Sequence, residues 1–178
     1  MRPLFFRRYN IDMGLLVFLV SLEFRSEKVE CWVKADDTLQ VSASYTMVAA
    51  PTSKFCLMFP LPEEGVDFRV IGAENCQLKD QGDVQTLCLH FGQDSVMQVK
   101  VVYSQRFPDR VYRYITTTTK AWGKPLQSAK FVVKTPWPAD ISYRADSVKQ
   151  DSTGYTYWVD FEDFWPEQDL IFQPAENK

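Results

Sequence analysis

Alternation of apolar and polar side chains with a period of two limits the fold of this chain more than any other feature. The stretches LQVSASYTM (39–47), TLCLHF (86–91) and MQVKV (97–101) all show it. Successive side chains of a strand point to opposite faces of a sheet, so each stretch predicts a strand that buries one face. Stretches with helical periodicity are almost absent outside the N-terminal segment.

Turn signals such as PLPEEG, DQGD and GQD separate these strands by eight to a dozen residues, a spacing typical of antiparallel sandwiches. Twelve strands are predicted, near residues 27–34, 38–48, 54–60, 66–72, 75–79, 84–91, 95–105, 110–119, 128–135, 140–148, 154–161 and 169–173. We therefore predict an all-β fold, an antiparallel two-sheet β-sandwich that is immunoglobulin-like or larger. It is expected to span residues 26–178, as one sandwich or as two packed halves that meet near residues 105–110.

Four consecutive threonines at residues 116–119 follow the strand-like stretch VYRYI. β-Branched residues are stiff and favour an extended backbone, so this run is expected to prolong the strand up to the turn KAWGKP.

A basic and then apolar segment precedes the first predicted strand. Arg2, Arg7 and Arg8 come before residues 13–22, ten residues without charge. This order is typical of a secretory signal, and the run is shorter than the roughly 20 apolar residues that span a bilayer. We predict that residues 1–25 are a signal-like or anchoring segment, which makes the protein secreted, periplasmic or membrane-associated at the envelope. The alternative, a buried first strand over residues 13–24, implies a cytoplasmic protein.

The charge balance argues against nucleic acid as a partner. The 178 residues carry 20 Lys plus Arg and 23 Asp plus Glu, a net charge of -3, with no basic cluster outside the N-terminus. Nucleic-acid binding depends on a basic patch that neutralises phosphates, and none is visible in the sequence.

The cysteines Cys31, Cys56, Cys76 and Cys88 are even in number, and none forms a C-x-x-C pair. This spacing argues against a zinc knuckle, and in an exported protein it permits two disulfides. Cys76 with Cys88 is the favoured pair, because a hairpin at KDQGD would place the two opposite each other. The alternative is that all four are small buried thiols.

Few residues suit catalysis. His90 is the only histidine, and Cys88 with His90 is the one candidate nucleophile and base, without a visible third group. There is no G-x-S-x-G motif, and seven glycines offer neither a phosphate-binding loop nor a dinucleotide fingerprint. We therefore predict no catalytic residue and no cofactor, and keep a hydrolase as the third alternative.

The C-terminal stretch DFEDFWPEQDLIF mixes carboxylates with large aromatic residues. Asp160, Asp163 and Asp169 could supply oxygen ligands to calcium, although their spacing is not that of an EF-hand loop. The favoured interpretation is a corner of the fold, in which Phe164 and Trp165 close the core and the carboxylates face water.

Aromatic residues make up 15% of the chain and allow a second interpretation. Trp122, Tyr155, Tyr157 and Trp165 could form a platform on which sugar rings stack, as on shallow sites of β-sandwiches. The competing interpretation is that these rings fill the core of the sandwich.

Several short motifs recur in a recognisable order: FPLPEEG (59–65), VKVVYSQRF (99–107), YRYITTTTKAWGKPL (112–126), FVVKTP (131–136) and DFEDFWPEQDLIF (160–172). This order resembles uncharacterised bacterial secreted or envelope β-sandwich domains of unknown function. The resemblance covers about residues 27–173, implies a non-catalytic extracytoplasmic module and assigns no functional residues. The predicted function is an interaction or structural module of the cell envelope, bound to an envelope protein or a glycan. A carbohydrate-binding module is the main alternative.

Overall fold

The computed structural model describes residues 22–60, 68–71, 76–80, 84–93 and 95–176. The predicted export segment lies outside these residues except for its last few positions, where the first strand begins at Glu23. The signal-like segment and its alternative, a first strand over residues 13–24, therefore stay predictions. No helix in the described part of the chain is long and apolar enough to cross a membrane.

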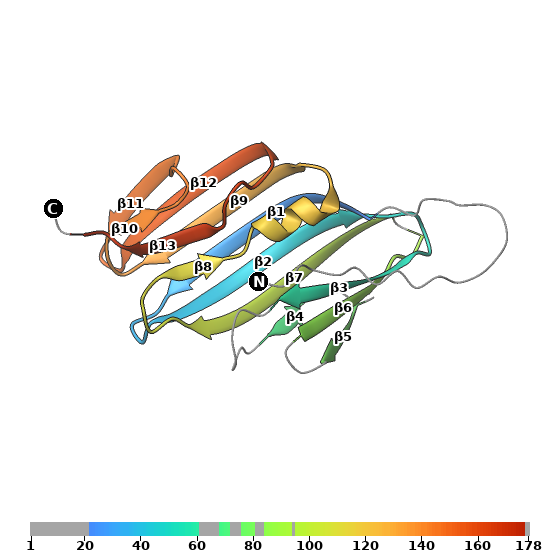
Figure 1. Ribbon diagram of the computed structural model, residues 1–178, viewed down its shortest axis with the longest axis horizontal. Coiled ribbons are helices and arrows are strands. Elements are labelled where there is room, and N and C mark those ends of the chain that lie inside the picture. The colour runs from blue at the N-terminus through green and yellow to red at the C-terminus, as the bar shows by residue number, and fades with distance from the viewer. Residues whose placement is uncertain (1–21, 61–67, 72–75, 81–83, 94, 177–178) are drawn as a thin grey trace.

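The described residues form strands and one short 3₁₀-helix, η1 (Figure 1). In chain order the elements are β1 (Glu23–Val33), β2 (Thr38–Val48), β3 (Lys54–Pro60), β4 (Arg69–Ile71), β5 (Cys76–Asp80), β6 (Val84–His90), β7 (Val96–Arg106), β8 (Tyr112–Tyr114), η1 (Thr117–Trp122), β9 (Leu126–Thr135), β10 (Ala139–Ile141), β11 (Ser147–Asp151), β12 (Gly154–Phe164) and β13 (Leu170–Pro174). The prediction of an all-β fold is confirmed.

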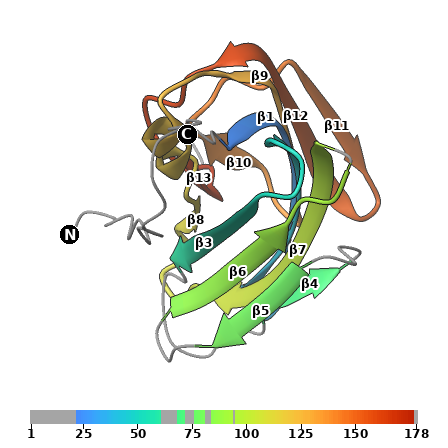
Figure 2. The same cartoon turned by 90° about the vertical axis from the view of Figure 1, so that its right-hand side faces the viewer.

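The strands form one large sheet and two small ones. The large sheet has seven strands in the order β11-β12-β9-β1-β2-β7-β4, and the small sheets have the orders β10-β13-β8 and β3-β6-β5. Both small sheets lie over the same face of the large sheet, which gives a sandwich-like arrangement (Figure 2). Two features differ from the predicted antiparallel two-sheet sandwich: the described strands form three sheets, and β1 pairs with β9 in parallel. This pair joins strands from both sides of residues 105–110 into one sheet.

The core fills the space between the large sheet and the two small sheets. Strand β2 shows why: its side chains alternate strictly between buried and half-buried, so Leu39, Val41 and Ala43 point inward. Residues from all three sheets meet there, including Phe131 of β9, Leu89 of β6 and others. Each fully buried side chain of this size contributes about 1.5–3 kcal/mol through the area it removes from water. No described element covers the outer face of the large sheet (Figure 2).

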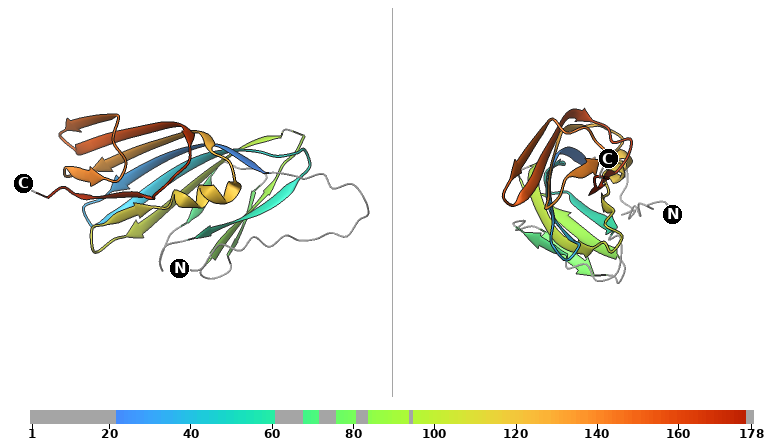
Figure 3. Two further views of the ribbon diagram at one scale, coloured as in Figure 1. Left: turned by 45° about the horizontal axis from the view of Figure 1, so that its top comes forward. Right: turned by 90° about the vertical axis from the view of Figure 1, so that its left-hand side faces the viewer.

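The threonine run does not prolong β8, contrary to the prediction. Thr116 has helical backbone angles, and η1 follows it on the inner side of the large sheet (Figure 3). The backbone N–H groups of Thr116 and Thr117 both donate to the carboxylate of Asp169, which compensates the β preference of threonine. Gly123 ends the helix with φ 71°, and its N–H donates to the carbonyl of Lys120 at 3.0 Å.

The C-terminal stretch is a corner of the fold, as predicted, although two of its residues differ from expectation. Phe164 is buried with 4% of its surface exposed, but Trp165 is 42% exposed and does not close the core. Asp163 turns the backbone with φ 50°, a left-handed conformation that Asp tolerates better than most residues. Asp169 does not face water but is buried, because it caps η1.

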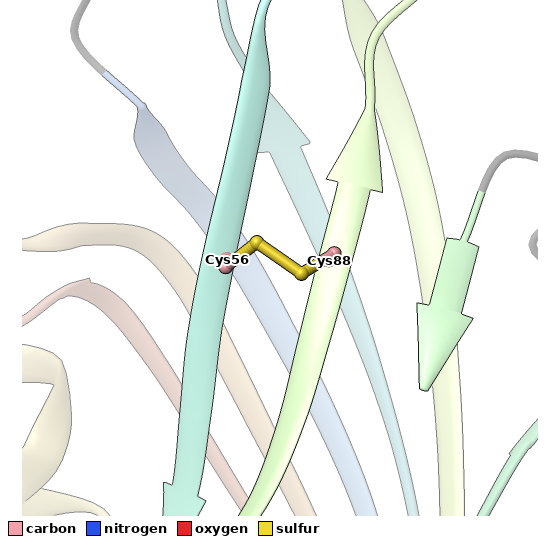
Figure 4. Close-up of a disulfide and its surroundings, with 2 residues drawn as sticks. All are labelled: Cys56 and Cys88. Carbon is pink, nitrogen blue, oxygen red and sulfur yellow. A yellow bond between two sulfur atoms is a disulfide. The ribbon is translucent and has the colours of Figure 1, made fainter. Parts of the chain in front are cut away.

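One disulfide joins Cys56 of β3 to Cys88 of β6, which lie directly opposite each other (Figure 4). The favoured pairing of Cys76 with Cys88 is wrong. Cys88 is bonded to Cys56, and the backbone register pairs Cys76 with Leu89 rather than with Cys88. Cys31 is a buried free thiol. A disulfide of this kind is typical of proteins in oxidising compartments.

Candidate functional site

The predicted sugar platform is not assembled as a row of exposed rings. Tyr155 and Tyr157 stack with their centroids 6.4 Å apart, but Tyr155 is half-buried and Tyr157 is buried. The hydroxyl of Tyr157 accepts a hydrogen bond from the N–H of Ala139 at 2.7 Å, so this pair belongs to the core. Trp165 is exposed at the corner, and the side chain of Trp122 lies outside the described part of the structure.

The three aspartates considered for calcium do not converge. Asp160 is exposed and faces Lys130 at 3.9 Å, and Asp163 is exposed at the corner. Asp169 is buried beneath η1 and is fully engaged by protein donors. Across the residues that the structure describes, no three Cys, His, Asp or Glu side chains gather as they would around a metal ion.

Asp169 instead joins three elements of the fold. Its Oδ1 accepts hydrogen bonds from the N–H groups of Thr116 and Thr117 at 3.1 and 3.0 Å and from the Thr117 hydroxyl at 2.8 Å. Its Oδ2 accepts from Nε of Arg113 at 2.7 Å and from the Nη2 group of the same guanidinium. Burial acts to raise the pKa of Asp169, but the Thr117 and Arg113 hydrogen bonds outweigh it and hold the pKa below its ordinary value.

The Cys88 and His90 pair cannot act as a thiol nucleophile with its base. The sulfur of Cys88 is bonded to Cys56, so it has no thiolate to offer to a substrate or a metal. His90 is exposed at the end of β6, opposite Lys54 of β3.

A network of ionisable groups missed by the sequence reasoning lies inside the sandwich. Glu27 of β1 faces inward between Tyr45 of β2 and Ala129 of β9, and its Oε1 accepts a hydrogen bond from the Tyr114 hydroxyl. Tyr114 has one proton to give, so the Tyr45 hydroxyl, 2.8 Å away, donates to the Tyr114 oxygen. The second oxygen of Glu27, Oε2, is buried and has no hydrogen-bond partner among the described residues.

Burial in this network favours the neutral form of every acid. It raises the pKa of Glu27 from 4.5 to about 7, and the hydrogen bond from Tyr114 offsets only part of that rise. Burial also raises the pKa values of Tyr45, Tyr114 and Cys31. Glu27 is thus the member of this network that exchanges a proton near neutral pH. The alternation of β1 held the signal, because Glu27 shares its phase with Val29 and Cys31.

The outer face of the large sheet carries two tryptophans among polar side chains. Trp32 of β1 lies opposite Lys134 of β9, and Trp158 of β12 lies opposite Val132 of β9. Both rings are half-buried, and the ammonium of Lys134 lies over the Trp32 ring, 5.2 Å from its centroid. We call the outward-facing side of β11, β12, β9, β1, β2 and β7 the tryptophan face.

A sequence signal for the tryptophan face existed. Trp32 stands between Cys31 and Val33, and Trp158 between Tyr157 and Val159, so alternation puts each tryptophan on the polar side of its strand. A large aromatic ring that shares a strand face with charged residues indicates a binding surface, whereas a ring in phase with the apolar residues indicates the core.

No protein-family model matches the sequence, and no curated protein matches it at a significant level. Among solved structures, the chain is similar to a protein from Legionella pneumophila subsp. pneumophila described as a "putative nutrient binding protein", with a TM-score of 0.64 and 14% identity. The match covers 86% of this chain and 68% of that one.

The chain is also similar to the M1 zinc metallopeptidase from Deinococcus radiodurans, with a TM-score of 0.52 and 12% identity. That match covers 87% of this chain but 42% of the peptidase, so the chain spans less than half of that enzyme. At these identities the likeness is one of fold: the chain has a β-sandwich arrangement that occurs in both proteins.

Proposed function

We propose that this protein is a non-catalytic interaction module that works outside the cytoplasm, secreted or at the cell envelope. The observation that carries the proposal is the tryptophan face, a sheet surface that no described element covers. Trp32 and Trp158 both leave part of their rings in water there, although the fold has a large core. Tryptophan is enriched at binding interfaces, where it supplies a large contact area from a rigid side chain.

The ionisable groups of the inner face support a binding role over a catalytic one. A general acid or base must come within hydrogen-bond reach of its substrate. Glu27 and Asp169 are buried and hydrogen-bonded to Tyr114, Arg113 and Thr117 within the fold. These contacts give both carboxylates a structural role inside the fold. The outer face of the large sheet therefore remains as the surface for recognition.

Two further observations support the proposed location outside the cytoplasm and the proposed role in binding. The Cys56–Cys88 disulfide fits an oxidising compartment, which agrees with the export-like order of the N-terminal residues. The description of the similar Legionella protein names binding, and this chain covers about two thirds of that protein.

The test is sedimentation of the purified protein with an envelope fraction of its own host. We expect the wild-type protein and a Trp165→Ala variant to sediment with the fraction, and a Trp32→Ala, Trp158→Ala double variant to remain in the supernatant. Trp165 is the matched control because it is an exposed tryptophan outside the strands that define the tryptophan face. Equal sedimentation of the double variant would contradict the proposal.

A further inference from the structure

We infer that the tryptophan face binds an acidic polysaccharide, with its sugar rings stacked on Trp32 and Trp158 and its anionic groups held by lysines. The inference deepens the proposed function and rests on it, because it names the ligand class for the same surface. Nothing in the likeness to solved structures assigns this face a ligand.

The charge of the face favours an anionic ligand. Pairing and alternation place eleven charged side chains on it: Glu23, Lys28, Glu30, Lys100, Arg106, Lys130, Lys134, Lys149, Asp151, Asp160 and Glu162. Six of these are cationic and five anionic, so the face has a small net positive charge on a chain whose net charge is -3. The rest of the molecule is correspondingly acidic, and an acidic polymer would be directed to this side.

Three of the cations already face carboxylates: Lys28 with Glu30 at 3.2 Å, Lys130 with Asp160 at 3.9 Å and Lys149 with Asp151 at 3.9 Å. Lys134, Lys100 and Arg106 have no ion pair with any described residue and are the cations most available to a ligand. The ammonium of Lys134 lies over one face of the Trp32 ring, so a sugar stacked on the other face would have its acidic group near this cation.

The spacing of the two rings suits a chain rather than a single small molecule. Trp32 and Trp158 lie on strands separated by β9, and the Trp158 row is offset from the Trp32 row by two residues. With strands about 4.8 Å apart and about 3.3 Å per residue along a strand, the two Cα atoms are about 12 Å apart. Two rings on Cα atoms this far apart can each hold a separate unit of a polymer.

The surroundings of the rings favour sugars over a peptide. The tryptophans lie on inner strands whose backbone groups pair with neighbouring strands, so a peptide cannot add to the sheet there as an extra strand. Val132, opposite Trp158, is apolar, but Gln40 and Ser42 of β2 and Thr156 of β12 are polar neighbours on the same face. Amide and hydroxyl groups match the hydroxyls of a sugar, while a helical peptide would require an apolar groove.

The experiment is titration calorimetry of the full chain with four probes of similar length: oligogalacturonate, a heparin fragment, an uncharged cello-oligosaccharide and poly-glutamate. We expect an acidic saccharide to bind, with an affinity that falls as salt is added. Trp32→Ala and Trp158→Ala should each weaken that binding by about tenfold, in line with the loss of one ring contact. Trp165→Ala should leave the affinity unchanged, and Lys134→Glu should lower it without removing a ring.

Several results would overturn the inference. One is that neither acidic saccharide binds. Another is that the uncharged saccharide binds with the same affinity as the acidic ones. A third is that poly-glutamate binds and the tryptophan variants do not affect its binding. Lys134→Glu keeps the inference falsifiable if an alanine variant fails to fold, because this side chain is on the surface and outside the core. If the double tryptophan variant loses envelope binding while no acidic saccharide binds, the interaction module stands and the ligand class is wrong.

Discussion

The buried carboxyl of Glu27 is expected to make the stability of this protein decrease as the pH rises toward neutrality. The folded state holds the proton on Glu27 up to about pH 7, whereas the unfolded chain releases it near 4.5. Between these values the folded state binds more protons, so the free energy of unfolding falls with increasing pH. The stabilisation is complete below about pH 4.5 and is lost by about pH 7, which is opposite to the usual effect of an ion-paired carboxylate.

The magnitude follows from the two pKa values. A rise from 4.5 to about 7, at 1.36 kcal/mol for each pH unit, corresponds to about 3 kcal/mol. Glu27 is 3% exposed, so solvent screening does not reduce this figure as it would for a surface carboxylate. Against a typical total stability of about 5–15 kcal/mol, a change of this size is easily measured.

The perturbation is Glu27→Gln, which keeps an oxygen that accepts the Tyr114 hydrogen bond but cannot ionise. Urea unfolding followed by tryptophan fluorescence at about pH 5 and about pH 8 gives the free energy of unfolding of both proteins. We expect similar values at the lower pH and a variant more stable by up to about 3 kcal/mol at the higher pH. Asp160→Asn, at an exposed carboxylate, is the matched control.

Glu27 would not be the source of the pH dependence if Glu27→Gln and the wild type showed the same dependence on pH. The predicted direction would also be wrong if the wild type gained stability relative to the variant between about pH 5 and about pH 8. Tyr114→Phe provides an independent check, because it removes the hydrogen bond that lowers the pKa of Glu27. The decline in stability should then extend to a higher pH than in the wild type.

Three further predictions test the corner, the capping carboxylate and a crowded glycine by urea unfolding. Phe164→Ala should lower the free energy of unfolding by about 3–5 kcal/mol because the ring is buried, whereas Trp165→Ala should lower it by less than about 1 kcal/mol. Equal losses would contradict the interpretation that Phe164, and not Trp165, closes the core at this corner. Asp169→Ala should cost about 2–4 kcal/mol because it leaves buried N–H groups unpaired, and a loss no larger than that of the exposed control Asp160→Ala would argue against the cap. Gly154→Ala should cost at least about 2 kcal/mol, since φ is 131° and a Cβ would stand 2.1 Å from a carbonyl oxygen; a neutral change would show that the turn can relax.

The strands were predictable because their signal is local. Alternation over residues 38–48 sets the bounds of β2, and the next long strand, β7, was predicted within one residue at each end. Phase within a strand also predicts the side of the sheet, which is why Glu27 belongs to the inner face and Trp32 to the outer one. Strand bounds and the apolar side of a strand depend on residues close together in the chain, so they can be read from the sequence.

Which distant side chains meet on those faces follows only from the tertiary structure. Thr116 leaves the extended conformation because Asp169, 53 residues away in the chain, accepts a hydrogen bond from its backbone N–H. Cys88 pairs with Cys56 rather than Cys76 because the register between strands, and not the hairpin turn, places sulfur atoms together.

The same holds for the chemistry of Glu27. Its pKa depends on burial inside the sandwich and on the hydrogen bond from Tyr114, 87 residues away in the chain. The sequence by itself determined which residues form strands and which side of each strand is apolar, because those follow from the two-residue period. Only the fold decided which distant side chains meet, since hydrogen bonds and desolvation act through space and not along the chain.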